Sequence, residues 1–332
     1  MKKIINSPEN IVEEMLEGMV ITNQDLLQKI DNFNIIVRKK RKEKKVALIS
    51  GGGSGHEPAH AGYVGHGMLD AAVAGPVFTS PSAQAIYTAL KEIQTEKGIL
   101  AIIKNYSGDV MNFKMAIEMA QDEGINCDYV VVNDDIAIKE QNNRRGIAGT
   151  VFVHKIAGAA AEKGYDLTKI KNLAEKAIAS IRTMGVALEP CYNPTTGKPS
   201  FELGPQEMEF GLGIHGEPGV SRRKLLPSSD IAELLLEDLF EEMNLKDEKI
   251  AVMINSLGST PDMELNILAR DINNILRKQE CEVYRFFVGN FMTSMEMKGI
   301  SITLFKLNDQ LIKLLNYPST TIKSIGRCGY DE

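Results

Sequence analysis

Short apolar runs alternate with amphipathic segments along the first half of the chain. Brief apolar runs next to turn residues are typical of buried strands, and a period of about 3.6 residues is typical of helices. Buried strands are predicted at 45–50, 98–106 and 127–133. Helices are predicted at 8–19, 82–91, 112–123 and 150–163. This alternation predicts an α/β fold, with a largely parallel or mixed sheet covered by helices.

Local details of these segments lead to further expectations. Ser7 and Pro8 would cap the first helix, because a proline in the first turn loses no hydrogen bond. The first strand would end in a loop at Gly51. The helix at 112–123 has a methionine every four residues, which we interpret as core packing rather than as a cofactor-binding stripe. These methionines are Met111, Met115 and Met119.

A segment rich in proline and glycine separates the two halves of the chain. Pro190, Pro194, Gly197 and Pro199 cluster there, as is typical of a domain boundary. Further strands are predicted beyond it, at 250–255, 283–289 and 300–307, with a helix between the first two. A chain of 332 residues is long enough for two cores. We therefore expect two α/β domains, 1–188 and 189–332.

Composition and charge narrow the class of protein. The chain is 43% hydrophobic and 25% charged, and its net charge is −6 at pH 7. An acidic chain is poorly suited to direct DNA contact, which needs a basic field. The basic run at 38–45 is interpreted as a solvated loop before a strand. We expect no membrane span and no export signal, because the apolar runs are too short.

The cysteines and the scattered histidines predict no metal site. The cysteines form no C-x-x-C pair, so we expect reduced thiols and a cytoplasmic location. They are Cys127, Cys191, Cys281 and Cys328. His60 and His66 are not close to other ligand residues in the sequence, and His154 is expected to be a surface or interface residue of its helix.

Two glycine-rich segments each carry a histidine next to a glutamate and a proline. The first segment, 50–58, reads SGGGSGHEP and contains His56. The second, 210–219, reads FGLGIHGEPG and contains His215. Glycines remove the Cβ atoms that would crowd an imidazole, so a ligand can approach each ring closely. We expect the two segments to form two walls of one site.

The first of these segments does not match the nucleotide-binding loops. A P-loop ends in Gly-Lys-Ser/Thr and the dinucleotide motif needs G-x-G-x-x-G spacing, and 51–57 has neither. A small, neutral, polar ligand is therefore expected. The segment with Lys104 and Asp109 closes the next strand at the same expected edge of the sheet, together with 134–135. The two could form a surface ion pair, or could bind ligand hydroxyls with Asp109 accepting a proton.

Several long segments together resemble the substrate-binding subunit family of dihydroxyacetone kinase. The similarity extends over nearly the whole chain. The segments are 51–58, 78–81 (FTSP), 104–109 (KNYSGD), 208–211 (MEFG), 213–219 (GIHGEPG), 255–261 and 292–299.

The resemblance implies how such a ligand would be captured. In this family the histidine that matches His215 adds through a ring nitrogen to the ketone carbon of dihydroxyacetone and forms a covalent hemiaminal. An ordinary histidine has a pKa of about 6.5, so it is mostly neutral at cytoplasmic pH, as the addition requires. Glu217 would orient His215.

The resemblance also implies which residues bind the hydroxyls of the captured ligand. They lie in two segments, and they are Gly53, Ser54, Gly55, His56, Lys104 and Asp109. In the kinase, a separate L subunit carries ADP with Mg²⁺ and phosphorylates the captured ligand, so this chain itself would need no cofactor. Asp109 would then be the general base, with His56 as its assistant.

A paralogue in the family implies a different role. It uses the loaded pocket as a sensor and binds a TetR-type transcription factor as a coactivator. Two departures from the kinase pattern favour this role: the loop 133–146 is shorter, with no glycine before Arg144, and the ending 325–332 replaces one that usually contains tryptophan. We predict the sensor, with the kinase subunit as the alternative. The family implies a homodimer in both cases.

An enzyme that acts alone on a sugar, such as an aldolase or isomerase using His215, is a third possibility. The sequence shows neither a catalytic lysine motif nor a metal-ligand cluster to support it.

Overall fold

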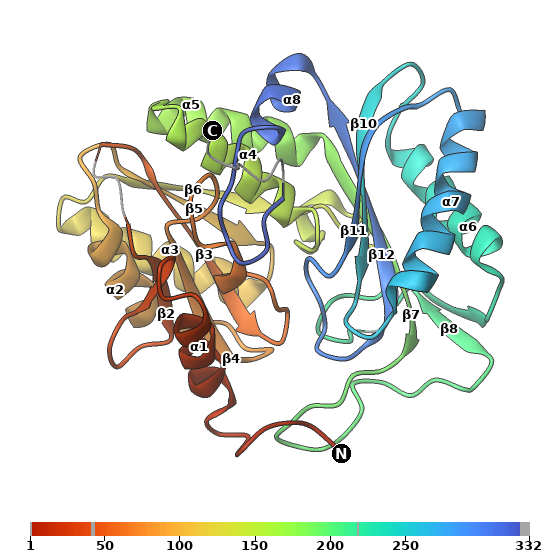
Figure 1. The fold of residues 1–332 in the computed structure, drawn as a ribbon, viewed down its shortest axis with the longest axis horizontal. Helices are drawn as coiled ribbons and strands as arrows, with labels where there is room; N and C mark the ends of the chain where they lie inside the picture. Colours follow the sequence, from red (N-terminus) through yellow and green to blue (C-terminus); the bar gives the residue numbers. More distant parts are fainter. Residues whose placement is uncertain (1, 41–43, 218, 326–332) are drawn as a thin grey trace. The chain divides into compact units, whose positions relative to one another are not determined.

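The chain folds into two compact units in a computed structural model that describes residues 2–40, 44–217 and 219–325 (Figure 1). The N-terminal unit comprises Lys2–Val132, Thr150–Ile178 and the chain from Leu311 onward. The C-terminal unit comprises Asn133–Gly149 and Ala179–Gln310. Cys328 and the rest of the distinctive ending at 326–332 lie outside the described residues, as does Pro218. Among the helices of the described ranges, none combines the length and the apolar character that crossing a membrane requires.

The N-terminal unit is built on a six-stranded mixed sheet with the order β1-β2-β4-β3-β5-β6. Strands β4, β3, β5 and β6 are parallel, and β2 and β1 continue one edge antiparallel. This confirms the expected largely parallel sheet. The strands are β1 (Leu27–Lys29), β2 (Ile35–Arg38), β3 (Ala47–Ser54), β4 (Ala71–Val77), β5 (Ile99–Lys104) and β6 (Cys127–Val132).

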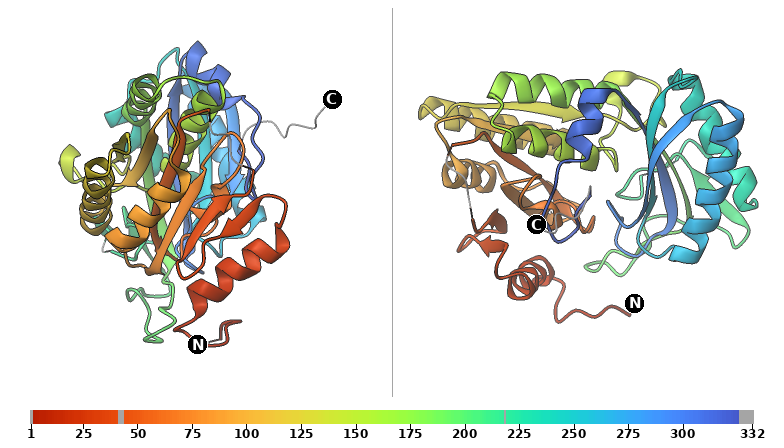
Figure 2. Two further views of the ribbon diagram at one scale, coloured as in Figure 1. Left: turned by 90° about the vertical axis from the view of Figure 1, so that its left-hand side faces the viewer. Right: turned by 45° about the horizontal axis from the view of Figure 1, so that its top comes forward.

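Helices cover both faces of this sheet (Figure 2). Helices α2 and α3 pack together on one face, over alternate strand residues such as Ile49 and Ala101. Helix α4 contacts β3 and β5 on the other face and is buried from Thr150 to Ala161. The helices are α1 (Ile11–Thr22), α2 (Ala83–Ile93), α3 (Ser107–Asp122), α4 (Thr150–Glu162), α5 (Leu167–Ala179) and α8 (Asp309–Leu315).

Strand β3 continues through the glycines at which a loop was predicted. Gly51 and Gly52 pair in register with Val73 and Ala74 of β4. A Cβ on Gly51 would lie 2.5 Å from the carbonyl oxygen of Val73. The glycines therefore allow close packing within the sheet, which local sequence does not distinguish from a turn.

Two helices begin at other positions than predicted. Helix α3 starts at Ser107, so Asp109 lies in its first turn rather than in a loop. Helix α1 starts at Ile11 with Asn10 as its N-cap residue, after Ser7 and Pro8.

The prediction of core packing was wrong for two methionines of α3, and the third, Met119, is half-buried. Met111 is 60% exposed and Met115 is 49% exposed. The core face of α3 is made by Phe113, Ala116 and Ile117 instead. The four-residue spacing identified one face of the helix but not the face that is buried.

The basic run at 38–45 was predicted to be a solvated loop, but both of its ends are buried. Arg38 ends β2 and its guanidinium lies 2.5 Å from Glu162 Oε1. Lys45 Nζ lies 2.5 Å from Asp70 Oδ2. Burial of these cations is possible because each has a carboxylate partner. Residues 41–43, between them, lie outside the described ranges.

The C-terminal unit has a second six-stranded sheet, with the order β11-β10-β12-β7-β8-β9. Strands β10 and β11 are parallel, and the other neighbours are antiparallel. Helices α6 (Ser228–Glu242) and α7 (Asp262–Lys278) pack over one face with an aliphatic core. The strands are β7 (Ile181–Glu189), β8 (Glu207–Phe210), β9 (Ser221–Lys224), β10 (Lys249–Ser256), β11 (Glu282–Gly289) and β12 (Lys298–Leu307).

The division into units is more complex than a single boundary between residues 188 and 189. Strand β7 precedes that point but pairs with β12 and β8 inside the C-terminal sheet. The segment Asn133–Gly149 also belongs to the C-terminal unit, and the chain returns to the N-terminal unit at Leu311. Proline and glycine indicate a loop in the sequence, but they do not indicate which sheet a strand joins.

Candidate functional site

A buried ion pair lies at the carboxyl end of β5. Lys104 is the last residue of β5, and its Nζ donates to Asp109 Oδ2 at 2.8 Å and to the Gly51 carbonyl at 3.4 Å. Their side chains are 0% and 3% exposed, so this is not the surface pair that was one reading of the sequence. A Cβ on Gly52 would lie 2.2 Å from Nζ, so the lysine needs glycine at this position.

Asp109 keeps one carboxylate oxygen for a further partner. Its Oδ1 is buried and has no hydrogen-bond partner among the described residues. A buried polar atom without a partner is costly, so such an atom at the end of a parallel strand is typical of a ligand-binding position. Asp109 also lies in the first turn of α3, where the helix dipole favours its negative charge.

His56 lies against the segment 78–81. Its ring stacks on Phe78, with 5.2 Å between the centroids. Phe78 has a φ of 56°, an unusual conformation for a bulky residue that often marks a functional site. A Cβ on Gly53 would lie 2.6 Å from the Thr79 amide nitrogen, so the absence of a side chain at 53 lets this segment approach β3.

Ser54 and Gly55 connect the strand to His56. The Ser54 hydroxyl donates to the Gly75 carbonyl at 2.7 Å, and the Gly55 amide donates to Glu57 Oε1 at 3.0 Å. The side chain of Ser54 thus holds β3 and β4 together. Burial raises the pKa of Glu57 against the opposing effect of the Gly55 hydrogen bond.

His60 and His154 form a buried pair that the sequence did not reveal. His60 Nδ1 lies 3.0 Å from His154 Nε2 and 3.3 Å from the Ser50 hydroxyl, which itself donates to the Ile102 carbonyl at 2.7 Å. Because the serine proton is used, a hydrogen bond between His60 Nδ1 and Ser50 has Nδ1 as its donor. Burial lowers the pKa of His60 well below its usual value and that of His154 to about 3, so both rings are neutral.

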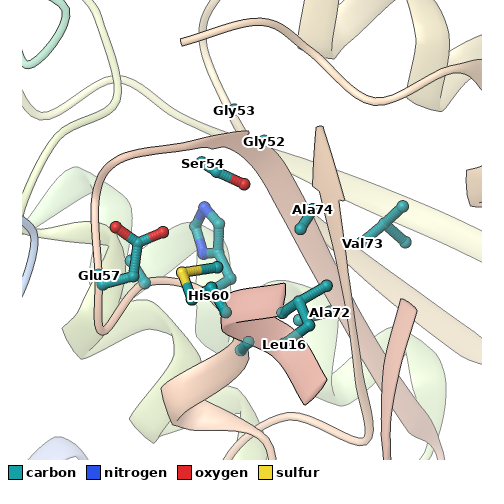
Figure 3. Close-up of a pocket in the computed structure, with 12 residues that line it drawn as sticks. Leu16, Gly52, Gly53, Ser54, Glu57, His60, Ala72, Val73 and Ala74 are labelled. Atoms are coloured by element: carbon teal, nitrogen blue, oxygen red, sulfur yellow. The ribbon is translucent and has the colours of Figure 1, made fainter. Parts of the chain in front are cut away.

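The expectation that His154 lies at the surface was wrong. Its side chain is completely buried in α4. The His60 ring points toward the strand with Gly52, Gly53 and Ser54 and borders a cavity of about 10 Å³, enough for one water (Figure 3). A histidine within the apolar run of α4 was the one sequence signal that could have suggested a buried partner.

His215 lies in a glycine-rich loop of the C-terminal unit that follows β8. Gly211 and Gly216 both have a φ of 76°, in the left-handed region that favours glycine. A Cβ on Gly213 would lie 2.3 Å from Glu217 Oε2, so glycine is also required there for space. The His215 side chain is 19% exposed and can be reached by a small ligand.

Both carboxylate oxygens of Glu217 bind His215. The His215 amide donates to Oε2 at 2.9 Å, and ring atom Nδ1 lies 3.1 Å from Oε1. An ionised carboxylate only accepts hydrogen bonds, so Nδ1 carries a proton, and in the neutral ring the lone pair is then on Nε2. Burial tends to raise the pKa of Glu217, but the hydrogen bond and charge of His215, with the charge of Arg145, lower it to about 2.

Asp134 and Asp135 are engaged within the C-terminal unit. Asp134 accepts hydrogen bonds from the amides of Ile147 and Gly149, both at 2.8 Å, and from the Thr183 hydroxyl at 2.6 Å. Asp135 Oδ2 accepts from Arg145 Nε at 2.6 Å. The carboxylates expected beside the ligand thus hold the loop 133–149 together.

The residues of the two glycine-rich segments belong to different units. The N-terminal unit brings together Lys104, Asp109 and the glycines of β3, with His56 against Phe78. His215 and Glu217 form a second arrangement in the C-terminal unit. Within the described residues, no group of three or more histidine, cysteine, aspartate or glutamate side chains could hold a metal ion.

Comparisons with known proteins agree with these features. A Dak1 domain model matches residues 17–323. The chain is 48% identical over 327 residues to the dihydroxyacetone-binding subunit DhaK of PTS-dependent dihydroxyacetone kinase 1 from Listeria innocua, covering 97% of this chain and 99% of that protein. It is also 48% identical to the DhaK subunit of the Lactococcus lactis kinase, covering 97% and 98% of the two chains.

A solved structure with the same fold is a regulatory protein rather than a kinase subunit. It is the dihydroxyacetone kinase operon co-activator DhaQ, which superposes with a TM-score of 0.89 at 41% identity. The match covers 92% of this chain and 96% of the other. The chain therefore belongs to the Dak1 domain family.

Proposed function

We propose that this protein binds dihydroxyacetone covalently through Nε2 of His215. The observation that carries the proposal is the bond between His215 Nδ1 and Glu217 Oε1, because in the neutral ring it places the proton on Nδ1 and the lone pair for addition on Nε2. The 48% identity to proteins described as dihydroxyacetone-binding subunits supports the choice of ligand.

The addition balances without a cofactor. The lone pair of Nε2 forms a bond to the ketone carbon, and the electrons of the C=O π bond move to oxygen. The ring then carries a positive charge until its Nδ1 proton leaves, while the new alkoxide gains one proton. Glu217 stabilises the cationic ring through its hydrogen bond to Nδ1, and the product is a neutral hemiaminal.

This chemistry also explains selectivity. Glycerol has similar hydroxyls but no carbonyl carbon, so it cannot form the bond to His215. We propose that Lys104, Asp109, His56 and the backbone of Gly53 bind the hydroxyls of dihydroxyacetone. The free Oδ1 of Asp109 and the ammonium of Lys104 provide an acceptor and a donor for this purpose.

For the subsequent step, we propose that the protein presents the captured ligand to an ADP-bearing subunit for phosphorylation. A buried carboxylate with one unpartnered oxygen can act as the general base that phosphorylation uses. Asp109 would accept the hydroxyl proton as the oxygen attacks phosphorus. The match to two kinase subunits over nearly their whole length supports this role.

A coactivator that senses dihydroxyacetone is the second candidate. The short loop 133–146 and the likeness to the co-activator DhaQ favour it. In that role the loaded protein would bind a TetR-type transcription factor instead of a phosphoryl donor. Both roles require the same capture reaction at His215.

Mass spectrometry of the intact protein under native conditions tests capture. We expect dihydroxyacetone to add its whole mass without loss of water, because a hemiaminal forms by addition alone. His215→Ala should lose the adduct, whereas the control His66→Gln, a partly exposed histidine paired with Glu162, should keep it. An adduct of equal yield on His215→Ala would contradict the proposal.

Two further measurements separate the roles. Turnover with an ADP-bearing kinase subunit and a phosphate source would establish the phosphoryl-acceptor role. Co-elution with a TetR-type factor only when dihydroxyacetone is present, without any turnover, would establish the sensor.

A further inference from the structure

Arg145 lies next to the His215 loop and is held by two groups. Its Nε donates to Asp135 Oδ2 at 2.6 Å, and one terminal nitrogen donates to the Gly211 carbonyl at 3.0 Å. Arg145 is 9% exposed and Asp135 is 1% exposed. The Asp135 carboxylate is itself fixed, because its Oδ1 accepts from the Ala137 amide at 3.0 Å.

The other terminal nitrogen of Arg145 lies near Glu217. A Cβ on Gly213 would lie 2.7 Å from this nitrogen and 2.3 Å from Glu217 Oε2. The guanidinium and the carboxylate therefore both lie close to the same point above Gly213. The two groups have opposite charges, and the charge of Arg145 helps to lower the pKa of Glu217. Arg145 thus contacts the loop at Gly211, where it begins, and faces Glu217, near its end.

We infer that Arg145 is a positioning residue for His215 that acts through Glu217, and that Asp135 holds Arg145 in place. This inference rests on the proposed capture of a ketone by His215. Asp135, Arg145, Glu217 and His215 form a series in which negative and positive groups alternate. The series connects the loop 133–149 to the reactive ring.

The charge of Arg145 has a specific consequence for the imidazole. A carboxylate bonded to Nδ1 favours the imidazolium form, which has no lone pair for addition. A guanidinium beside the same carboxylate offsets that effect and keeps Glu217 directed at Nδ1. A second charged pair flanks this loop: Arg222 in β9 donates to Glu209 in β8, and Glu209 accepts a hydrogen bond from the Gly219 amide.

Binding of dihydroxyacetone across a pH series tests the role. We expect Arg145→Met to weaken binding about tenfold at neutral pH, as loss of one charged contact would, and to raise the pH of half-maximal adduct formation by about one unit. Arg145→Lys should recover part of the pH shift because it restores the charge. The isosteric Asp135→Asn should change both quantities in the same direction, but less.

Arg222→Met is the matched control, because Arg222 lies in β9, directly after this loop, but pairs with Glu209. We expect it to bind as the wild type does. Wild-type affinity and wild-type pH dependence in folded Arg145→Met would overturn the inference. A similar loss of affinity in Arg222→Met would also overturn it, because the effect would then not be specific to Arg145.

A second readout does not depend on capture. In the ligand-free protein, ¹⁵N NMR of the imidazole should report the Nδ1-protonated tautomer of His215 in the wild type and in Arg222→Met. We expect a mixture of tautomers or imidazolium in folded Arg145→Met at the same pH, and an unchanged spectrum would contradict the inference. If the wild type forms no adduct, the proposed function fails, but this spectrum still decides the role of Arg145.

Discussion

At the level of single residues, the proposed reactivity of His215 depends on the carboxylate of Glu217. That carboxylate binds both the amide and Nδ1 of one residue, which fixes the ring and its tautomer. The sequence could suggest the pair, because glycine surrounds the histidine and the glutamate is two residues away. It could not show the contribution of Arg145, which is distant in sequence and approaches through the space left by Gly213.

The low pKa of Glu217 predicts how acid affects stability. Burial opposes ionisation, but the bond to His215 lowers the pKa from an ordinary 4.5 to about 2. The contribution of this group to the free energy of unfolding is therefore present above pH 4.5 and is lost as the pH falls toward 2. We expect the wild type to be more stable than Glu217→Gln above this range.

Urea titrations at a series of pH values measure the difference in the free energy of unfolding between the wild type and Glu217→Gln. It should shrink between pH 4.5 and about 2. The control Glu202→Gln, at an exposed position of the same unit, should differ little from the wild type throughout. A constant difference between the wild type and Glu217→Gln would show that the pKa of Glu217 is not lowered in the folded state.

At the level of elements, continuous apolar runs and amphipathic helices were predicted well. β5, β6, β10 and α7 appear close to their expected positions because their patterns are locally complete. β4 was missed, since its alanines, glycine and proline give a weak apolar signal. The glycines of β3 were mistaken for a loop. They let Lys104 and β4 pack closely against the backbone of β3, and the local sequence does not show these partners, which lie elsewhere in the chain.

A substitution at one of these glycines tests whether the space that it leaves for Lys104 is needed for ligand binding. Gly52→Ala would place a methyl group 2.2 Å from Lys104 Nζ, so the ammonium must move away from Asp109. We expect the affinity for dihydroxyacetone to fall at least about tenfold, as for loss of one charged hydrogen bond. Isothermal titration calorimetry measures this directly.

Gly18→Ala is the matched control for this substitution. Gly18 lies inside α1, and an added Cβ would meet no atom within 4 Å. We expect unchanged ligand affinity and a free energy of unfolding higher by about 1 kcal/mol, because alanine favours helix. Wild-type affinity in Gly52→Ala would show that Lys104 does not bind the ligand.

At the level of the whole molecule, the family and the mixed α/β architecture could be predicted, but the choice of partner could not. The preference for a sensor depended on two segments. The ending at 326–332 lies outside the described residues, and the loop 133–149 is held by Asp134 and Asp135 in a way that kinase and sensor could both use. Self-association as a homodimer also stays a prediction.

Asp109→Asn separates the two roles in the complete system. The amide keeps the shape of the side chain but cannot accept the hydroxyl proton. With an ADP-bearing subunit, we expect turnover to fall by about 10²- to 10⁴-fold while the adduct on His215 still forms. Circular dichroism should first verify that the variant folds, since Lys104 loses its buried partner. Undiminished turnover would remove Asp109 as the base.

The most direct test is NMR of the bound ligand. Dihydroxyacetone labelled with ¹³C at its ketone carbon is added to protein labelled with ¹⁵N in histidine. We predict that the ketone signal moves to the saturated-carbon region and shows a one-bond ¹³C–¹⁵N coupling to His215 Nε2, which disappears in His215→Ala. A bound ligand that keeps its ketone signal, or one that shows no coupling to nitrogen, would contradict covalent capture.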